Sequence, residues 1–420
     1  MAPLPGADLT KSDSGQIDDQ QSATSLPGWA IYPLVSQIFN ESIKLGGEAR
    51  IVGGAVRDWL AGLPVGDIDM AVSLPIDKVV AHFSALDFKV VKTGIKFGTI
   101  TLVDDVMSIQ LTQTRVDLET DGRHAVVAHN ANWLADAMRR DFTVNAIYLD
   151  ADGVLHDPLG GLADLRAKRL RFAGDADLRV REDALRILRY CRFLPRFISG
   201  GIDPDALAAL SENAALCRNL SGERVANEMR RILVGPELTF VIELINETAI
   251  DQHALGVRLD AARLSFLASS GLRASVEFVW IAVLAVLAPA GSGAHLSSRL
   301  CLGRAEKAAL LAYDSGLEAN ELAQLNGPKW KQAAYFLGRY AAGKYAVQLI
   351  REGKSPAPER LLAIADWQRP QFPLRGADLL SHGVDNGSAV GQLLDQAERR
   401  WVASDFTLGK SALLDWLIGG

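Results

Sequence analysis

Ile51-Val-Gly-Gly-Ala-Val-Arg-Asp58 is followed closely by Gly66-Asp-Ile-Asp69, and the two stretches predict a helix that two glycines open and then a short strand. Glycine lets a phosphate approach the bare backbone N–H groups of a helix start. Asp67 and Asp69 alternate on an apolar strand, so both carboxylates aim at one face. Two close carboxylates repel unless a cation lies between them, and Mg²⁺ prefers oxygen ligands. A phosphate cradle beside a metal seat indicates phosphoryl or nucleotidyl transfer.

Each half of this pattern also has a plain structural interpretation. Gly53-Gly54 could form an ordinary turn, and the two aspartates could lie on a solvated strand edge. The glycines match neither the G-x-x-x-x-G-K loop nor the G-x-G-x-x-G fingerprint of nucleotide-binding folds. The combination of the two halves favours a functional site.

The composition bounds the class of protein. The chain has 420 residues, 49% of them hydrophobic, so it can bury several cores, and two to four domains are expected. The formal net charge of −6 argues against nucleic-acid binding over the whole surface, although a local basic surface remains compatible with it. Three isolated cysteines fit a reducing compartment. The N-terminus has no apolar signal region, and the longest apolar run, 278–290, is too short to span a bilayer, so we expect a cytoplasmic protein without membrane contact.

The pattern along the chain predicts an α+β protein. Residues 1–25 are polar and predict a disordered tail. Residues 26–157 read as mixed α/β, whereas helical periodicity dominates from 158 to the end. Within the α/β part we expect two helices and four strands, at 55–61, 75–86, 67–72, 88–92, 97–103 and 106–112.

Two further motifs carry charged side chains. Arg139-Arg-Asp-Phe-Thr-Val-Asn-Ala146 combines two phosphate-binding forks with a carboxylate and an amide that could bond ribose, or it is a capped, arginine-rich helix end. In Arg181–Phe193, four polar residues recur every three positions, which on a helix makes neighbours adjacent: Asp183, Arg186, Arg189 and Arg192. Such a series could read a base edge and bind phosphates, or form ordinary ion pairs on a solvated face.

Taken together and in this order, the motifs GGAVRD…DID, RRDFTVNAI and REDALRILRYCRF resemble the bacterial tRNA nucleotidyltransferase/poly(A) polymerase family, the class II CCA-adding enzymes. Residues 160–172 and 222–233 also match family motifs, and the motif-bearing similarity covers about residues 50–235. The resemblance implies a polymerase-β-like nucleotidyltransferase head over 26–157, a helical neck that binds the nucleotide base and RNA over 158–235, and an all-helical, tRNA-binding body and tail over 236–420.

The resemblance also implies roles for single residues. Asp67 and Asp69 would bind two Mg²⁺ ions, one activating the RNA 3′-hydroxyl and the other steadying the leaving pyrophosphate. Asp183 and Arg186 would act as a protein template that pairs with the incoming cytosine or adenine. The remaining implied nucleotide contacts are Gly54, Arg57, Arg140, Asp141, Arg189 and Arg192.

One position departs from the family pattern. The family usually carries a third acidic residue on the strand before its T-x-R element, and this chain has Gln110 there. An amide can orient a water molecule but brings no charge to the metals. Asp117 or Glu119, just downstream, could compensate.

The Lys92–Thr101 stretch resembles the TG-x-x-x-GT form of the CCA-adding branch rather than the basic element of poly(A) polymerases. The expected function is therefore addition of C, C and A to tRNA 3′ ends from CTP and ATP. We expect the acceptor stem to lie along residues 160–235, which contain fourteen Lys or Arg residues and ten Asp or Glu residues. The alternatives are a poly(A) polymerase, an enzyme adding CC or A alone, and a catalytically silent RNA-binding protein.

Overall fold

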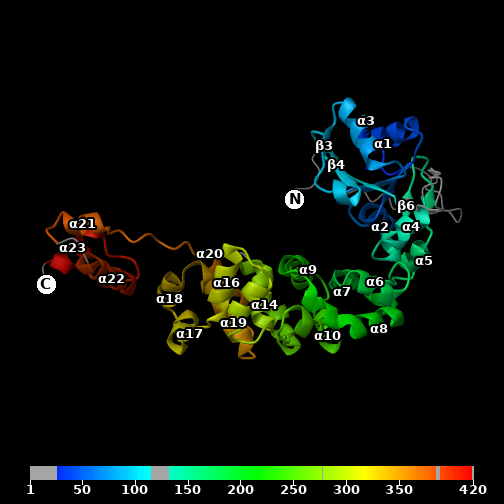
Figure 1. Ribbon diagram of the computed structural model, residues 1–420. Helices are drawn as coiled ribbons and strands as arrows, with labels where there is room; N and C mark the ends of the chain where they lie inside the picture. Colours follow the sequence, from blue (N-terminus) through cyan, green and yellow to red (C-terminus); the bar gives the residue numbers. More distant parts are fainter. Residues whose placement is uncertain (1–25, 115–131, 277, 385–387, 419–420) are drawn as a thin grey trace. The chain divides into compact units, whose positions relative to one another are not determined.

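The computed structural model in Figure 1 describes four stretches of the chain: residues 26–114, 132–276, 278–384 and 388–418. The chain divides into two compact units, Met1–Ala214 and Ala215–Gly420. The predicted tail of residues 1–25 and the acidic residues Asp117 and Glu119 lie outside the described ranges.

The first unit is built on a mixed sheet, as the sequence predicts. Its strands follow the spatial order β3-β4-β5-β2-β1-β6-β7. The β2–β5 pair is parallel and the other neighbouring pairs are antiparallel. The strand bounds are β1 (Ala49–Val52), β2 (Asp69–Val72), β3 (Lys89–Val91), β4 (Thr99–Val103), β5 (Ser108–Gln113), β6 (Tyr148–Leu149) and β7 (Leu155–His156).

The two faces of β4 and β5 differ because side chains alternate along a strand. Ile100, Leu102, Ile109 and Leu111 are buried, and α3 (Ile76–Ala85) packs against β3 and β4. Gln110, on the opposite face, is exposed. The sheet therefore keeps one apolar face for the core and leaves the other face, at β5, open to solvent.

The helices of this unit flank the sheet and then continue the chain beyond it. Their bounds are α1 (Pro33–Lys44), α2 (Gly54–Leu60), α3 (Ile76–Ala85), α4 (Trp133–Met138), α5 (Gly161–Arg166), α6 (Ala176–Glu182), α7 (Leu185–Phe193) and α8 (Pro204–Asn213).

Two sequence-based expectations need correction. The strand that carries the aspartates begins at Asp69, not at Asp67, because β1 leaves the sheet after Val52 and Gly53 turns away with φ 83°. The charged series of Arg181–Phe193 does not lie on one helix. α6 ends at Glu182, and Asp183 adopts an extended conformation with φ −152° and ψ 101° before α7 begins.

The second unit is helical throughout its described elements, in agreement with the predicted helical remainder. The apolar run at 278–290 forms the buried α14, against which α9, α16 and α19 pack. No helix among the described residues is long and apolar enough to cross a membrane. The helices are α9 (Gly222–Val234), α10 (Leu238–Glu247), α11 (Ile250–Ala254), α12 (Leu264–Ser269), α13 (Leu272–Ser275), α14 (Val279–Leu287), α15 (Gly293–Arg299), α16 (Arg304–Asp314), α17 (Ala319–Asn326), α18 (Trp330–Leu337), α19 (Ala341–Arg351), α20 (Pro358–Asp366), α21 (Gly376–Leu380), α22 (Ser388–Ala403) and α23 (Lys410–Ile418).

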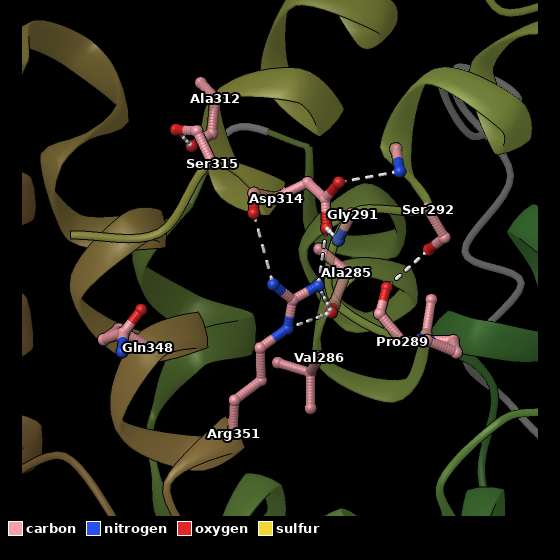
Figure 2. A network of polar contacts seen from close by, with 12 residues as sticks. Ala285, Val286, Pro289, Gly291, Ser292, Ala312, Asp314, Ser315, Gln348 and Arg351 are labelled. Carbon is pink, nitrogen blue, oxygen red and sulfur yellow. Dashed lines mark hydrogen bonds and ion pairs between the residues drawn. The ribbon is translucent and has the colours of Figure 1, made fainter.

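An ion pair joins four of these helices at their ends. Arg351, the last residue of α19, donates to the Asp314 carboxylate at 2.9 Å and to the Ala285 carbonyl of α14 at 2.7 Å (Figure 2). The same carboxylate accepts the N–H groups of Gly291 and Gly293, the latter at the start of α15. Both side chains of the pair are only 10% exposed. This nearly buried ion pair, which we call the Asp314–Arg351 lock, connects α14, α15, α16 and α19.

Candidate active site

The predicted metal ligands lie at the edge of the open sheet face. In the parallel pairing of β2 and β5, Asp69 is in register with Gln110. Paired residues of neighbouring strands point to the same side of a sheet, so the Gln110 amide stands beside the Asp69 carboxylate. Asp67 is exposed and lies two residues before Asp69. The structure therefore brings together the two aspartates and the glutamine that occupies the third position.

The Asp69 carboxyl responds to burial and to two neighbouring charges. Burial raises the pKa of the Asp69 carboxyl above its usual range, the Arg140 charge lowers it, and the Asp67 charge raises it again. Within the described residues, neither the Asp67 nor the Asp69 carboxylate accepts a hydrogen bond from a protein donor. A pair of close carboxylates without protein donors has the ligand chemistry that a hard divalent cation requires, so these residues fit Mg²⁺.

The glycine turn approaches the same carboxylate. Gly53 precedes α2 with φ 83°, a conformation that favours glycine. A Cβ atom at Gly53 would lie 3.8 Å from Nη1 of Arg140 and 3.9 Å from Oδ2 of Asp69. The turn, the arginine fork and the carboxylate thus surround one small space, with Gly54 as the first helical residue behind it.

Arg140 reaches this space from the segment after α4. Its Nε and Nη2 donate to the Asp136 carboxylate at 3.2 and 2.9 Å, and Nε also contacts the Tyr148 hydroxyl at 3.3 Å. Asp136 and Tyr148 are both fully buried. Sequence reasoning identified Arg140 but missed these two partners.

Arg57, a predicted phosphate contact, is nearly buried and bonds to protein groups. Its side chain is 6% exposed, and it donates to Asp58 at 2.9 and 2.8 Å and to the Asn145 side chain at 2.5 Å. The guanidinium also lies over the Phe193 ring, 5.0 Å from its centroid. Nε, Nη1 and Nη2 of Arg57 thus each donate to a protein group.

A polar chain links this arginine to the neck. Asn145 donates to Oδ1 of Asp141 at 2.8 Å, and Arg189 of α7 donates to Oδ2 of the same carboxylate at 2.9 Å. Burial alone would raise the pKa of the Asp141 carboxyl, but the Arg189 charge and these hydrogen bonds outweigh it and lower the pKa. Asp141 thus stays ionised and connects the sheet unit's loop to α7.

The predicted base-reading residues sit where α6 meets α7. The Asp183 carboxylate accepts a hydrogen bond of 3.1 Å from the N–H of Leu185, and this bond stabilises the first residue of α7. Arg186 donates to the carbonyls of Arg179 and Arg139, at 2.7 and 3.2 Å.

Farther along α7, the Arg192 guanidinium lies 4.2 Å from the centroid of the Phe193 ring. The structure keeps Arg186, Arg189 and Arg192 on one helix and places Asp183 just before it.

A second set of ligand-type side chains, Glu48, Asp150 and His156, gathers near the opposite end of β1. Glu48 accepts from Arg50 and Trp133, and His156 shares a 2.7 Å hydrogen bond with Asp150. Each of these three groups thus already has a protein partner, in contrast to Asp67 and Asp69.

Comparisons with known proteins agree with this architecture. Residues 49–171 match the model of the poly A polymerase head domain, and residues 201–255 match a probable RNA and SrmB-binding site of polymerase A. The chain is 32% identical to human mitochondrial CCA tRNA nucleotidyltransferase 1 over 89% of this chain and 87% of that protein. It is 28% identical to the CCA-adding enzyme of Listeria innocua, over 89% and 94% of the two chains.

A solved structure gives the same result. The Bacillus stearothermophilus CCA-adding enzyme in complex with CTP matches with a TM-score of 0.74 and 27% identity, covering 91% of this chain and 96% of that one. The head fold and its carboxylate-bearing strand thus define a nucleotidyltransferase. More particularly, the chain belongs to the family of CCA-adding tRNA nucleotidyltransferases.

Proposed function

We propose that this chain adds C, C and A to the 3′ ends of tRNA, using CTP and ATP and releasing pyrophosphate. The observation that carries the proposal is the convergence of Asp69, Gly53 and the Arg140 fork on one space, with Asp67 two residues before Asp69. The names of the relatives, and the CTP bound to one of them, support the same substrates.

In the proposed reaction, the 3′-hydroxyl oxygen of the RNA bonds to the α-phosphorus of the nucleotide. The bond from that phosphorus to the oxygen bridging to the β-phosphate breaks, pyrophosphate leaves with the bonding electrons, and the hydroxyl proton passes to solvent. Asp67 and Asp69 would hold two Mg²⁺ ions, whose Lewis acidity would lower the cost of charge on the attacking and leaving oxygens. Arg140 and the backbone at Gly54 hold the triphosphate.

The neck residues select the base in this proposal. Asp183 offers an acceptor and Arg186 a donor fork, which together can meet the edge of cytosine or adenine. Arg189 and Arg192 contact the nucleotide from the same helix, with Asp141 near the ribose. Arg57 remains a proposed phosphate contact, and its bonds to Asp58 and Asn145 also brace this polar chain.

The proposed RNA partner is tRNA, and its acceptor stem would lie along the basic segment 160–235. This segment contains fourteen Lys or Arg residues and ten Asp or Glu residues. Double-stranded RNA is read mainly through its shape and phosphates. The proposed site of action is the cytoplasm, and the proposed nucleotide partners are CTP and ATP.

Gln110 favours one alternative of another class, a catalytically silent RNA-binding protein, because it leaves two carboxylates where the family has three acidic groups. Incubating the full chain with tRNA that ends before CCA, labelled CTP and Mg²⁺ separates the two functions. The proposal expects label in the tRNA, and loss of that label with Asp69→Asn. Binding of tRNA without any incorporation would establish the silent protein instead.

A further inference from the structure

Arg140 is held along one edge of its guanidinium. Nε and Nη2 face the Asp136 carboxylate, and Nε also contacts the Tyr148 hydroxyl. Nη1 is the nitrogen that lies toward Gly53 and Asp69. A planar guanidinium bound along one edge presents its other edge in a fixed direction.

The group that binds this edge is deeply buried. Asp136 is 0% exposed and accepts from Arg139 at 2.6 Å and from the Tyr148 hydroxyl at 2.7 Å, in addition to Arg140. Burial would raise the pKa of the Asp136 carboxyl, but the charges of Arg140 and Arg139 outweigh it and lower the pKa. Burial raises the pKa of the Tyr148 phenol, so it keeps its proton and donates to the carboxylate.

The backbone of Arg140 is fixed as well. Arg179 of α6 donates to the Arg140 carbonyl at 3.0 Å. The Arg140 guanidinium also lies over the Tyr148 ring, 5.3 Å from its centroid. Both ends of the Arg140 residue are thus attached to buried or nearly buried partners.

We propose that Asp136 and Tyr148 form a buried clamp that aims Nη1 of Arg140 at the triphosphate of the incoming nucleotide. Asp136 and Tyr148 are positioning residues, since both are fully buried and act through their bonds to Arg140. The clamp removes rotamer freedom from a long side chain before the nucleotide arrives, and the negative charge of Asp136 reduces the repulsion between the two adjacent guanidiniums of Arg139 and Arg140. This inference rests on the proposed function and extends it by two residues.

The clamp predicts a loss of affinity confined to phosphate groups that Arg140 can reach. We would measure equilibrium binding of CTP and of CMP to the full-length chain with Mg²⁺, for wild type and Asp136→Asn. The variant should weaken CTP binding about tenfold, which corresponds to ~1.4 kcal/mol, and should change CMP binding less than about twofold. In the addition assay, KM for CTP should rise while kcat changes little.

Asp164→Asn is the matched control. Asp164 is also 0% exposed, and it binds two arginines, Arg169 and Arg171, together with one hydroxyl, that of Thr143. This variant removes the same kind of buried anion without touching Arg140. It should leave the ratio of CTP to CMP affinity as in the wild type.

Tyr148→Phe keeps the buried ring and removes one donor, so it gives an answer even where Asp136→Asn does not fold. It should lower CTP affinity about threefold relative to CMP. Equal weakening of CTP and CMP binding, or an unchanged ratio of the two affinities in the variants that fold, would overturn the clamp. Binding of CTP by the wild type would in that case leave the proposed function intact. Absence of both CTP binding and incorporation in the wild type would overturn the proposed function as well.

Discussion

Gln110 shows what a single residue changes at this site. Its register with Asp69 places a neutral amide beside the predicted metal ligands. Gln110→Glu should tighten binding of Mg²⁺ or Mn²⁺ several-fold, because a third carboxylate adds attraction for a divalent ion. Titration calorimetry with the metal alone measures this effect directly.

Thr112→Glu is the control for that substitution. Thr112 lies on the same face of β5 as Gln110, two residue pairs farther along the β2–β5 ladder, and bonds to Thr99. A carboxylate at residue 112 lies about 7 Å farther along β5 than one at residue 110, so it should change metal affinity much less. Equal gains in the two variants would show that net charge, rather than the Gln110 position, controls metal binding.

The aspartates of the site should differ in what they control. Asp69→Asn should lower addition of every nucleotide by about 10³-fold or more, because it removes a metal ligand. Asp183→Ala or Arg186→Ala should instead reduce discrimination against UTP and GTP by about tenfold, with metal affinity unchanged.

Because the Asp183 carboxylate also accepts the N–H of Leu185, the first residue of α7, Asp183→Asn serves as a control that retains an oxygen for this N–H. Single-turnover incorporation of the four nucleotides measures both effects. Uniform loss with all nucleotides in the Asp183 variants would contradict the template assignment.

Among single residues, sequence could predict the groups whose chemistry stands out in a motif. Asp69, Arg140 and Asp141 all lie in recognisable charged stretches. Asp136 and Tyr148 could not be found in this way, because an aspartate on a short helix and a tyrosine in an apolar strand have common structural interpretations. Their importance follows from burial and from distances between atoms, which appear only after the chain folds.

At the scale of elements, the three-residue spacing of the charged side chains predicted one helix across Arg181–Phe193. The prediction was wrong at Asp183, the first member of that series, where the helix is interrupted. Spacing places Asp183 on the same surface as Arg186, but the Asp183 side chain competes for the backbone N–H of Leu185 and interrupts the helix. The strand and helix predictions for residues 67–112 were correct within a few residues, because alternation and Pro75 mark those elements clearly.

Three buried or nearly buried carboxylates connect neighbouring elements of the first unit, and they predict its response to acid. Asp136, Asp141 and Asp164 each have a lowered pKa, since burial raises it but arginine charges and hydrogen bonds outweigh that effect. The unfolded chain therefore binds protons near pH 4 that the folded chain does not. The stability from these groups is present above the unfolded pKa and is lost as pH falls through the lowered folded pKa.

Urea unfolding between pH 7 and pH 3 measures this loss. The free energy of unfolding should decrease below about pH 4, and Asp164→Asn should have a lower free energy at pH 7 together with a shallower decrease. The same pH slope in wild type and variant would contradict this account of Asp164.

At the scale of the whole molecule, the second unit depends on the lock between Asp314 and Arg351 (Figure 2). Asp314→Ala leaves a nearly buried guanidinium without its anion, and removal of one partner of a buried pair costs about 3–5 kcal/mol. The unfolding transition of the helical unit should shift accordingly, while CTP affinity should not change. Lys354→Ala, which removes a more exposed ion pair with Glu352, should cost less than about 1 kcal/mol.

Composition and periodicity predicted the order of parts in the molecule, an α/β head followed by helices, because those signals sum over many residues. They could not predict the Asp314–Arg351 lock, whose partners are far apart in sequence and join α14, α15, α16 and α19 through backbone carbonyls and N–H groups. Long-range polar contacts of this kind leave no periodic trace in a sequence.

The most direct test of the central claim counts the nucleotides that the full-length chain adds to a tRNA lacking its CCA end. With Mg²⁺ and CTP alone, the product should be two residues longer, and with CTP and ATP together it should be three residues longer and then stop. Continued addition of A would contradict the claim and assign a poly(A) polymerase, whereas products that stop after CC in the mixture would assign a partial, CC-adding enzyme.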